Sequence, residues 1–176
     1  MAELGLHFTV IPSEIAEEHP PGTPADAVTA VALAKARAIA RRLGAEPPTI
    51  VLGADTEVVL DGELLGKPRD AADAARMLRA LRGRAHEVIT GVALVEAGRA
   101  GREEIANVST RVTMRDYGDD EIEAYVVTDE PFDKAGAYAV QGIGNRLVAA
   151  VDGCLSNVVG LPVSTTRRLL AGWGVG

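Results

Sequence analysis

Apolar and polar residues follow two different periods along the chain, and the alternation of these periods predicts alternating helices and strands. Apolar residues recur every three or four positions up to Leu43, which predicts an amphipathic helix. Thr23 is a suitable N-cap for it, Pro24 takes the first helical position and Asp26 completes a partial capping box. Gly44 is a suitable residue for ending the helix.

The same patterns predict the remaining elements. Further helices are expected at Asp70–Arg82 (closed by Gly83), Asp119–Val127 and Pro162–Ala171. Strands are expected at Phe8–Ile11 (ended by Pro12), Thr49–Ala54, Glu87–Val95, Ala106–Met114, Tyr138–Val140 and Arg146–Val151, with a turn near Gly98. The stretch from Thr56 to Leu65 reads as a hairpin that turns at Asp61-Gly62.

Composition narrows the fold class. Aromatic residues make up only 3% of the 176 residues, so aliphatic side chains must fill the core. This favours helices packed on a sheet, and the alternation of elements predicts an α/β fold with a mixed, twisted sheet. Repeats and long linkers are absent, and the Pro-rich stretches, including Glu46-Pro47-Pro48, are short enough to be loops. We therefore expect a single domain over residues 1–176.

Charge and targeting signals limit the partners. The net charge of −7 argues against nucleic acid but permits a small polyphosphate held by a few focused cations. Apolar runs are too short for a membrane span, and Met1-Ala2-Glu3 is not signal-like. Cys154 is the only cysteine, which excludes an internal disulfide. These features predict a cytoplasmic protein without nucleic-acid or membrane partners.

Asp55 is the first candidate for chemistry. It directly follows the apolar run that ends at Ala54, where a side chain can project from a rigid strand into a crevice. A carboxylate at that place can act as a general base or as a metal ligand. Asp is also common in turns, so a turn or capping role remains open.

Lys35 interrupts the apolar stripe of the first helix, which includes Val28, Val31 and Ile39. Burial of an ammonium group without a partner is costly. Two interpretations follow: the side chain extends to the edge of the core, or it points into a cleft and meets an anion there.

Three further charges are weaker candidates. Lys67 lies in the tight loop Gly66-Lys67-Pro68-Arg69 and could meet a phosphate, although exposed loop lysines are common. Glu17 and Glu18 follow the first predicted strand, and either could supply a second carboxylate for a metal or merely solvate a loop.

The stretch from Glu130 to Gly142 is the most unusual in the chain, because it combines charged residues with small ones and a tyrosine. Its glycines permit close approach of the backbone to a ligand, and the Gln141 amide can read the edge of a base. Phosphate-loop, HExxH, GxSxG and Cys/His-cluster motifs are all absent from the sequence.

Five segments in this order resemble the Maf family of nucleoside triphosphate pyrophosphatases, and the match covers nearly the whole chain. They are Gly53-Ala54-Asp55-Thr56, Gly66–Asp70, His86–Val92, Glu130–Gly142 and Asn157–Pro162. The resemblance implies a two-lobed α/β fold like that of inosine triphosphate pyrophosphatases. It also implies hydrolysis of a nucleoside triphosphate to a monophosphate and pyrophosphate with a divalent cation, Mg²⁺ or Mn²⁺.

Roles for individual residues follow from the resemblance. Asp55 corresponds to the proton acceptor for the attacking water, and Thr56 and Gln141 correspond to specificity positions. Lys35, Lys67 and Glu17 (or Glu18) correspond to charges of the cleft, and Asp55 with Glu17 is the expected metal-binding pair. Asp133-Lys134 followed by Gln141 resembles the subgroup that acts on dTTP and UTP.

The sequence departs from the family pattern at its start. The family opens with a strand and a Ser-x-Ser-Pro-Arg-Arg loop, whereas Met1 to Gly5 resemble the end of the helix that follows that loop. Reduced activity is therefore expected for this chain. Two alternatives stay open: a nucleotide-binding or cell-division regulatory protein without turnover, and a pyrophosphatase for modified purine nucleotides such as 7-methyl-GTP. The sequence does not decide the oligomeric state, and a homodimer is compatible with it.

Overall fold

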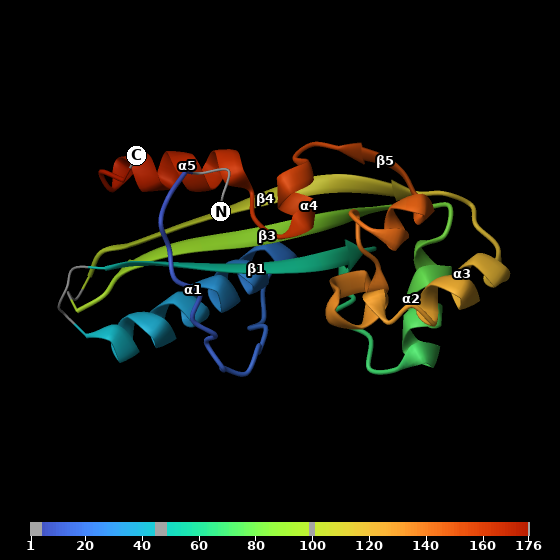
Figure 1. The fold of residues 1–176 in the computed structure, drawn as a ribbon, viewed down its shortest axis with the longest axis horizontal. Helices are drawn as coiled ribbons and strands as arrows, with labels where there is room; N and C mark the ends of the chain where they lie inside the picture. Colours follow the sequence, from blue (N-terminus) through green and yellow to red (C-terminus); the bar gives the residue numbers. More distant parts are fainter. Residues whose placement is uncertain (1–4, 45–48, 99–100, 176) are drawn as a thin grey trace. The chain divides into compact units, whose positions relative to one another are not determined.

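The computed structural model describes residues 5–44, 49–98 and 101–175 and combines helices with one sheet (Figure 1). The helices are α1 (Pro24–Leu43), α2 (Ala71–Leu81), α3 (Asp119–Val126), α4 (Leu155–Val159) and α5 (Val163–Gly172). The strands are β1 (Ile50–Leu60), β2 (Glu63–Leu64), β3 (Ala85–Glu96), β4 (Glu103–Met114) and β5 (Val148–Asp152). Short 3-10 helices span Glu130–Asp133, Ala135–Ala137 and Ile143–Leu147. Two predicted features, the helix end at Met1–Leu4 and the Glu46–Pro48 loop, lie outside the described residues.

The five strands form one antiparallel sheet in the order β2-β1-β3-β4-β5. The α/β class is therefore confirmed, whereas the expected mixture of parallel and antiparallel strands is wrong. Hairpins account for part of the difference, because a tight turn reverses the chain and makes the two strands that it joins antiparallel. The predicted turn at Asp61-Gly62 makes one such hairpin: Val59 pairs with Leu64 and Leu60 pairs with Glu63.

The chain divides into two compact units, and β1, β3 and β4 contribute residues to both. The first unit contains 1–55, 90–108 and 160–176. In this unit α1 and α5 cover opposite faces of the strands (Figure 1). Ala93 and Val95 of β3 pack with α1, whereas Val92 and Leu94 pack with α5, as expected for side chains that alternate along a strand.

The second unit contains 56–89 and 109–159. Its core is built from buried apolar side chains of α2 and α3 with those of the strands. Tyr117 and Tyr125 are among its largest fully buried side chains. Asp70 caps α2 by accepting a hydrogen bond from the Asp73 backbone, so the predicted start of this helix is confirmed.

Most predicted elements agree with the structure within a few residues. In α1 the capping box is complete, since Thr23 accepts from the Asp26 backbone and the Asp26 side chain accepts from Thr23. Gly44 has a positive φ of 71°, as a residue that ends a helix often does. The predicted last strand begins two residues late, at Val148, because the preceding residues form a 3-10 helix.

Two predicted strands are absent. Phe8–Ile11 is irregular: Phe8 and Val10 are exposed, and only Ile11 of this segment packs, partly buried, against a core cluster. Tyr138–Val140 is buried but lies outside the sheet, in a chain that runs between two 3-10 helices. Apolar β-branched and aromatic residues favour a strand, but a strand forms only where a neighbouring strand completes its hydrogen bonds.

Within the described residues, no helix combines the length and apolarity that a membrane crossing requires. Cys154 is a free thiol, as the sequence predicts, and its sulfur lies 3.2 Å from the Ser156 hydroxyl.

Candidate active site

Asp55 lies inside strand β1 rather than after its end. The prediction ended the strand at Ala54, but the residues from Thr56 to Leu60 continue it. They are rich in β-branched side chains, which favour extended backbone. Asp55 is only 6% exposed. A rigid strand therefore holds this carboxylate more firmly than a turn would, so the turn interpretation is wrong.

Glycine at position 53 allows helix α1 to approach β1 closely. A Cβ atom on Gly53 would collide with the Ala32 carbonyl oxygen and lie 3.0 Å from the Ala36 Cβ. Gly53 and Asp55 are two residues apart on one strand, so both face the same side. The helix that packs on Gly53 also carries Lys35, one residue before Ala36, and it therefore brings this lysine to Asp55.

Lys35 bridges two carboxylates. Its Nζ lies 2.7 Å from Asp55 Oδ1 and 2.7 Å from Glu17 Oε1. Burial lowers the pKa of Lys35, but the hydrogen bonds and charges of Asp55 and Glu17 outweigh this effect and raise it. Lys35 is therefore an ammonium group that points from the apolar stripe to anions. These anions belong to the protein itself, a possibility that sequence reasoning did not include.

Glu17 is the carboxylate of the predicted pair Glu17 and Glu18 that is bonded to Lys35. The loop that carries Glu17 also brings His19 to the site. His19 Nε2 lies 3.6 Å from Asp55 Oδ2, and the imidazole side chain is 25% exposed. Sequence reasoning missed His19, because no periodic pattern connects a loop residue with a strand 36 positions later.

Glu57 is a second buried carboxylate on β1, and the sequence analysis missed it as well. It is 6% exposed and faces the same side of the strand as Asp55. One oxygen of each carboxylate lies within 4.8 Å of the other. Glu57 Oε2 also accepts a hydrogen bond of 3.2 Å from the Gly66 backbone. The spacing of Asp55 and Glu57 could have indicated this residue, because two acids at alternate positions of a strand lie on the same face.

The carboxylates on β1 fit the donor set of a divalent cation, because Mg²⁺ and Mn²⁺ prefer oxygen ligands. Asp55 Oδ2 is buried and has no hydrogen-bond partner in the described part of the chain, so it is free to serve as a ligand. Glu57 supplies a neighbouring oxygen. Glu17 Oε1 is already bonded to Lys35, and among the described residues Glu57, but not Glu17, belongs to the group whose ligand atoms lie within 4.8 Å of Asp55, so Glu57 suits the second ligand position better.

A cavity of about 1180 Å³ lies beside these charges within the first unit. Lys35 and Glu17 line it, together with the irregular segment at Phe8–Ile11 and the first residues of β1. Such a volume accommodates a nucleotide-sized ligand.

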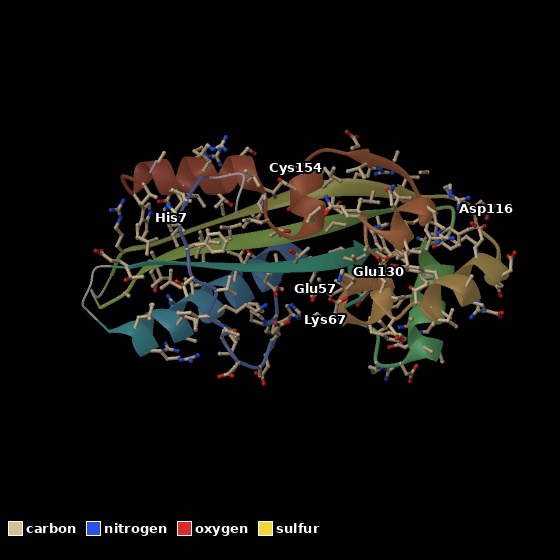
Figure 2. The ribbon with its side chains drawn as sticks, in the orientation of Figure 1. His7, Glu57, Lys67, Asp116, Glu130 and Cys154 are labelled. Carbon is tan, nitrogen blue, oxygen red and sulfur yellow. The ribbon has the colours of Figure 1, made fainter. Side chains whose placement is uncertain are left out.

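The other candidates lie in the second unit. Lys67 and Gln141 are exposed, and Thr56 is partly buried. Figure 2 shows Glu57 and Lys67, with Lys67 in the loop that follows β2. The Lys67 ammonium contributes to the low pKa of Asp133, after the larger effect of the hydrogen bond from Lys134.

Two of the sequence motifs are in contact inside this unit. The Gly136 N–H donates a 2.8 Å hydrogen bond to the Gly66 carbonyl. Gly136 has a φ of +69°, and a Cβ there would lie 2.8 Å from Val58. Glycine is therefore required for the loop of residues 133–137 to pack against β1 and the Gly66 loop.

Two buried carboxylates on one strand, one of them paired with a lysine, fit a protein class that binds anionic ligands together with a divalent cation. The chain belongs to the Maf family: residues 1–173 match the family model described as Maf-like protein. The names of its curated relatives specify an activity in addition to the family.

The chain is 53% identical over 178 residues to a dTTP/UTP pyrophosphatase of Moorella thermoacetica, with coverage of 99% of this chain and 89% of the relative. It is 52% identical over 172 residues to a dTTP/UTP pyrophosphatase of Anaeromyxobacter dehalogenans, with coverage of 97% and 85%. A third such relative, from Myxococcus xanthus, is 50% identical over 171 residues, with coverage of 97% and 84%.

Proposed function

We propose that this chain hydrolyses dTTP and UTP between the α and β phosphates and releases the nucleoside monophosphate and pyrophosphate. The single observation that carries this proposal is the buried Asp55 carboxylate, which Lys35 orients through Oδ1 and whose Oδ2 has no hydrogen-bond partner among the described residues. The relatives named dTTP/UTP pyrophosphatase support the substrate class. The net charge of −7 argues against nucleic acid as the ligand and permits a small polyphosphate held by a few cations.

Asp55 acts in this proposal as the acceptor of the proton from the attacking water. Hydrolysis of a phosphoanhydride depends mainly on positioning and on stabilisation of charge. A carboxylate that is held by a strand and by a 2.7 Å hydrogen bond loses little freedom when it orients a water. Lys35 supplies positive charge near the phosphates, and Lys67 supplies a second cation for the departing pyrophosphate.

A divalent cation, Mg²⁺ or Mn²⁺, would be held by Asp55 and Glu57, with Glu17 as a further carboxylate near Lys35. When bound, it would supply Lewis-acid stabilisation of the phosphate oxygens. The buried carboxylates of the chain position this charge, and Lys35 limits the mutual repulsion of Asp55 and Glu17.

Thr56 and Gln141 provide selection of the base. The Gln141 side chain is exposed, and its amide offers a donor and an acceptor that can pair with the edge of a pyrimidine. We also propose that the two units correspond to the lobes of an inosine triphosphate pyrophosphatase-like fold.

Pyrophosphate release from dTTP, UTP, GTP and 7-methyl-GTP, each with Mg²⁺ and with Mn²⁺, tests the proposal. We expect turnover of dTTP and UTP, and chromatography should show monophosphate rather than diphosphate as the product. Release of orthophosphate and diphosphate would contradict the bond assignment. A preference for 7-methyl-GTP would contradict the substrate class. Tight binding of dTTP without turnover would indicate a binding protein instead.

A further inference from the structure

Gln141 lies in the turn of residues 139–144. The backbone on both sides of Gln141 is hydrogen-bonded to one pair of side chains, Tyr125 and Glu130. On one side, the Ala139 N–H donates a 3.1 Å hydrogen bond to the Tyr125 hydroxyl. On the other side, the N–H groups of Ile143 and Gly144 donate to the Glu130 carboxylate at 3.1 and 2.8 Å. The backbone on both sides of Gln141 is therefore bonded to side chains that come from elsewhere in the second unit.

The two anchoring side chains are also bonded to each other. The Tyr125 hydroxyl donates a 2.8 Å hydrogen bond to Glu130 Oε2. Tyr125 is 1% exposed in α3, so its position is set by the core of the unit. Glu130 lies in the 3-10 helix that follows α3 (Figure 2). Burial raises the pKa of Glu130, but the hydrogen bonds from Gly144, Tyr125 and Ile143 outweigh it and lower the pKa.

Glycines let the carboxylate reach the backbone of the turn. Gly142 has a φ of +91°, and a Cβ at this position would collide with Glu130 Oε1. A Cβ at Gly144 would lie 2.5 Å from the Tyr125 hydroxyl oxygen. Both glycines face the anchoring groups, so the turn that carries Gln141 is shaped around the Glu130–Tyr125 pair.

We infer that Glu130 and Tyr125 are positioning residues that hold Gln141 for recognition of the pyrimidine base. This inference rests on the proposed function, and it adds two residues that do not touch the nucleotide themselves. Hydrogen bonds from several donors to a charged acceptor are strong and directional. They therefore restrict the turn more than hydrogen bonds to a neutral group would. A preorganised turn reduces the entropy cost of binding, and its loss weakens discrimination between bases.

The role predicts a specific kinetic pattern. Asp55 and Lys35 carry the proposed chemistry and belong to the first unit, whereas Gln141 belongs to the second, so loosening Gln141 raises KM for dTTP and leaves kcat nearly unchanged. GTP carries a larger purine with an additional amino group on that edge, so it is less well matched to Gln141 and is affected much less. A purely structural role would instead lower stability and change both substrates alike.

The experiment compares Glu130→Gln with the matched control Glu123→Gln. The Glu130 variant keeps the size of the side chain but replaces one acceptor with an amide donor that faces backbone N–H groups. Glu123 is an exposed glutamate of the neighbouring helix α3. We expect Glu130→Gln to reduce kcat/KM for dTTP about tenfold, mostly through KM, and to speed amide exchange at Ile143 and Gly144 by about tenfold. The control should match the wild type.

Two further measurements separate the possible failures. Pyrophosphate release by the wild type tests the proposed function alone. The ratio of equilibrium affinities for dTTP and GTP, measured in EDTA, tests the positioning role whether or not turnover occurs. If Glu130→Gln speeds exchange but keeps the wild-type ratio, the inference is overturned. If Glu130→Gln does not fold, Tyr125→Phe replaces it, since it removes only the hydroxyl, and an unchanged ratio there overturns the inference equally.

Discussion

The ammonium group of Lys35 lies 2.7 Å from the buried Asp55 carboxylate, although 20 positions separate the two residues along the chain. The contact joins the middle of α1 to the middle of β1. It explains why a lysine interrupts an apolar helix stripe, and it leaves the second oxygen of Asp55 without a hydrogen-bond partner in the described residues. The first two predictions test these two consequences.

Asp55→Asn should lower the rate of pyrophosphate release from dTTP at least about 100-fold, because the amide retains the shape of the side chain but cannot accept the proton. Circular dichroism should show a folded protein. Asp116→Asn, an exposed aspartate of the second unit, is the control and should retain wild-type turnover. Near-normal turnover by Asp55→Asn would remove Asp55 from the proposed mechanism.

Lys35→Met should lower the free energy of unfolding. If Lys35 had no partner on the apolar stripe, the substitution would instead preserve or raise the free energy of unfolding, because it would remove a charge that is costly to bury. The structure reverses this expectation, since the substitution leaves the 4% exposed Asp55 carboxylate without its cation. Loss of one partner of a buried pair costs about 3 kcal/mol, which corresponds to a decrease in Tm of roughly 6–12 °C.

Thermal unfolding monitored by circular dichroism measures this effect. Lys67→Met removes an exposed lysine and should leave Tm unchanged. The double variant Lys35→Met/Asp55→Asn should recover much of the lost stability, because no uncompensated carboxylate remains at position 55. A Lys35→Met protein as stable as the wild type would show that the ion pair adds nothing to folding.

His86 should make the second unit sensitive to acid. Its side chain is 4% exposed, and Nε2 lies 2.7 Å from the Tyr138 hydroxyl. Burial lowers the pKa of His86 to about 4. Because the unfolded chain binds a proton near pH 6.5 and the folded chain only near pH 4, stability is complete above pH 6.5 and decreases as the pH falls.

The decrease attributable to His86 between pH 7 and pH 5 is about 2 kcal/mol. Urea unfolding of the wild type and of His86→Gln at both pH values measures it, and the variant should lose this part of the slope. The control His7→Gln replaces an exposed histidine and should show the same decrease in stability between pH 7 and pH 5 as the wild type. Equal slopes for the wild type and His86→Gln would show that burial does not depress this pKa.

Gly53→Ala should destabilise the protein and displace Lys35, because the added methyl group meets the Ala32 carbonyl across the contact between α1 and β1. We expect a loss of about 2 kcal/mol or more, as for other overpacked core positions. Gly172→Ala is the matched control, since a Cβ there has no neighbour within 4 Å. At this helix end the change should be neutral or stabilise by up to about 1 kcal/mol. Urea unfolding compares the two, and equal effects would contradict the close approach at Gly53.

The sequence determined those features whose causes lie within a few residues of one another. Thr23, Pro24 and Asp26 set the start of α1, and Asp61-Gly62 sets the hairpin between β1 and β2. Caps and tight turns are satisfied by neighbouring backbone groups, so they can be predicted without knowing the fold. The family motifs could be recognised for the same reason, because each is a short continuous run.

Only the tertiary structure decided which side chains meet. The sequence left Lys35 between two interpretations and left Glu17 and Glu18 equivalent, and it did not single out Glu57. The bonds from Lys35 to Asp55 and Glu17 exist because α1 packs on Gly53, and the anchors of Gln141 exist because Tyr125 is buried in the second core. Local periodicity reports which face of an element is buried, whereas contacts between distant residues depend on which element covers that face.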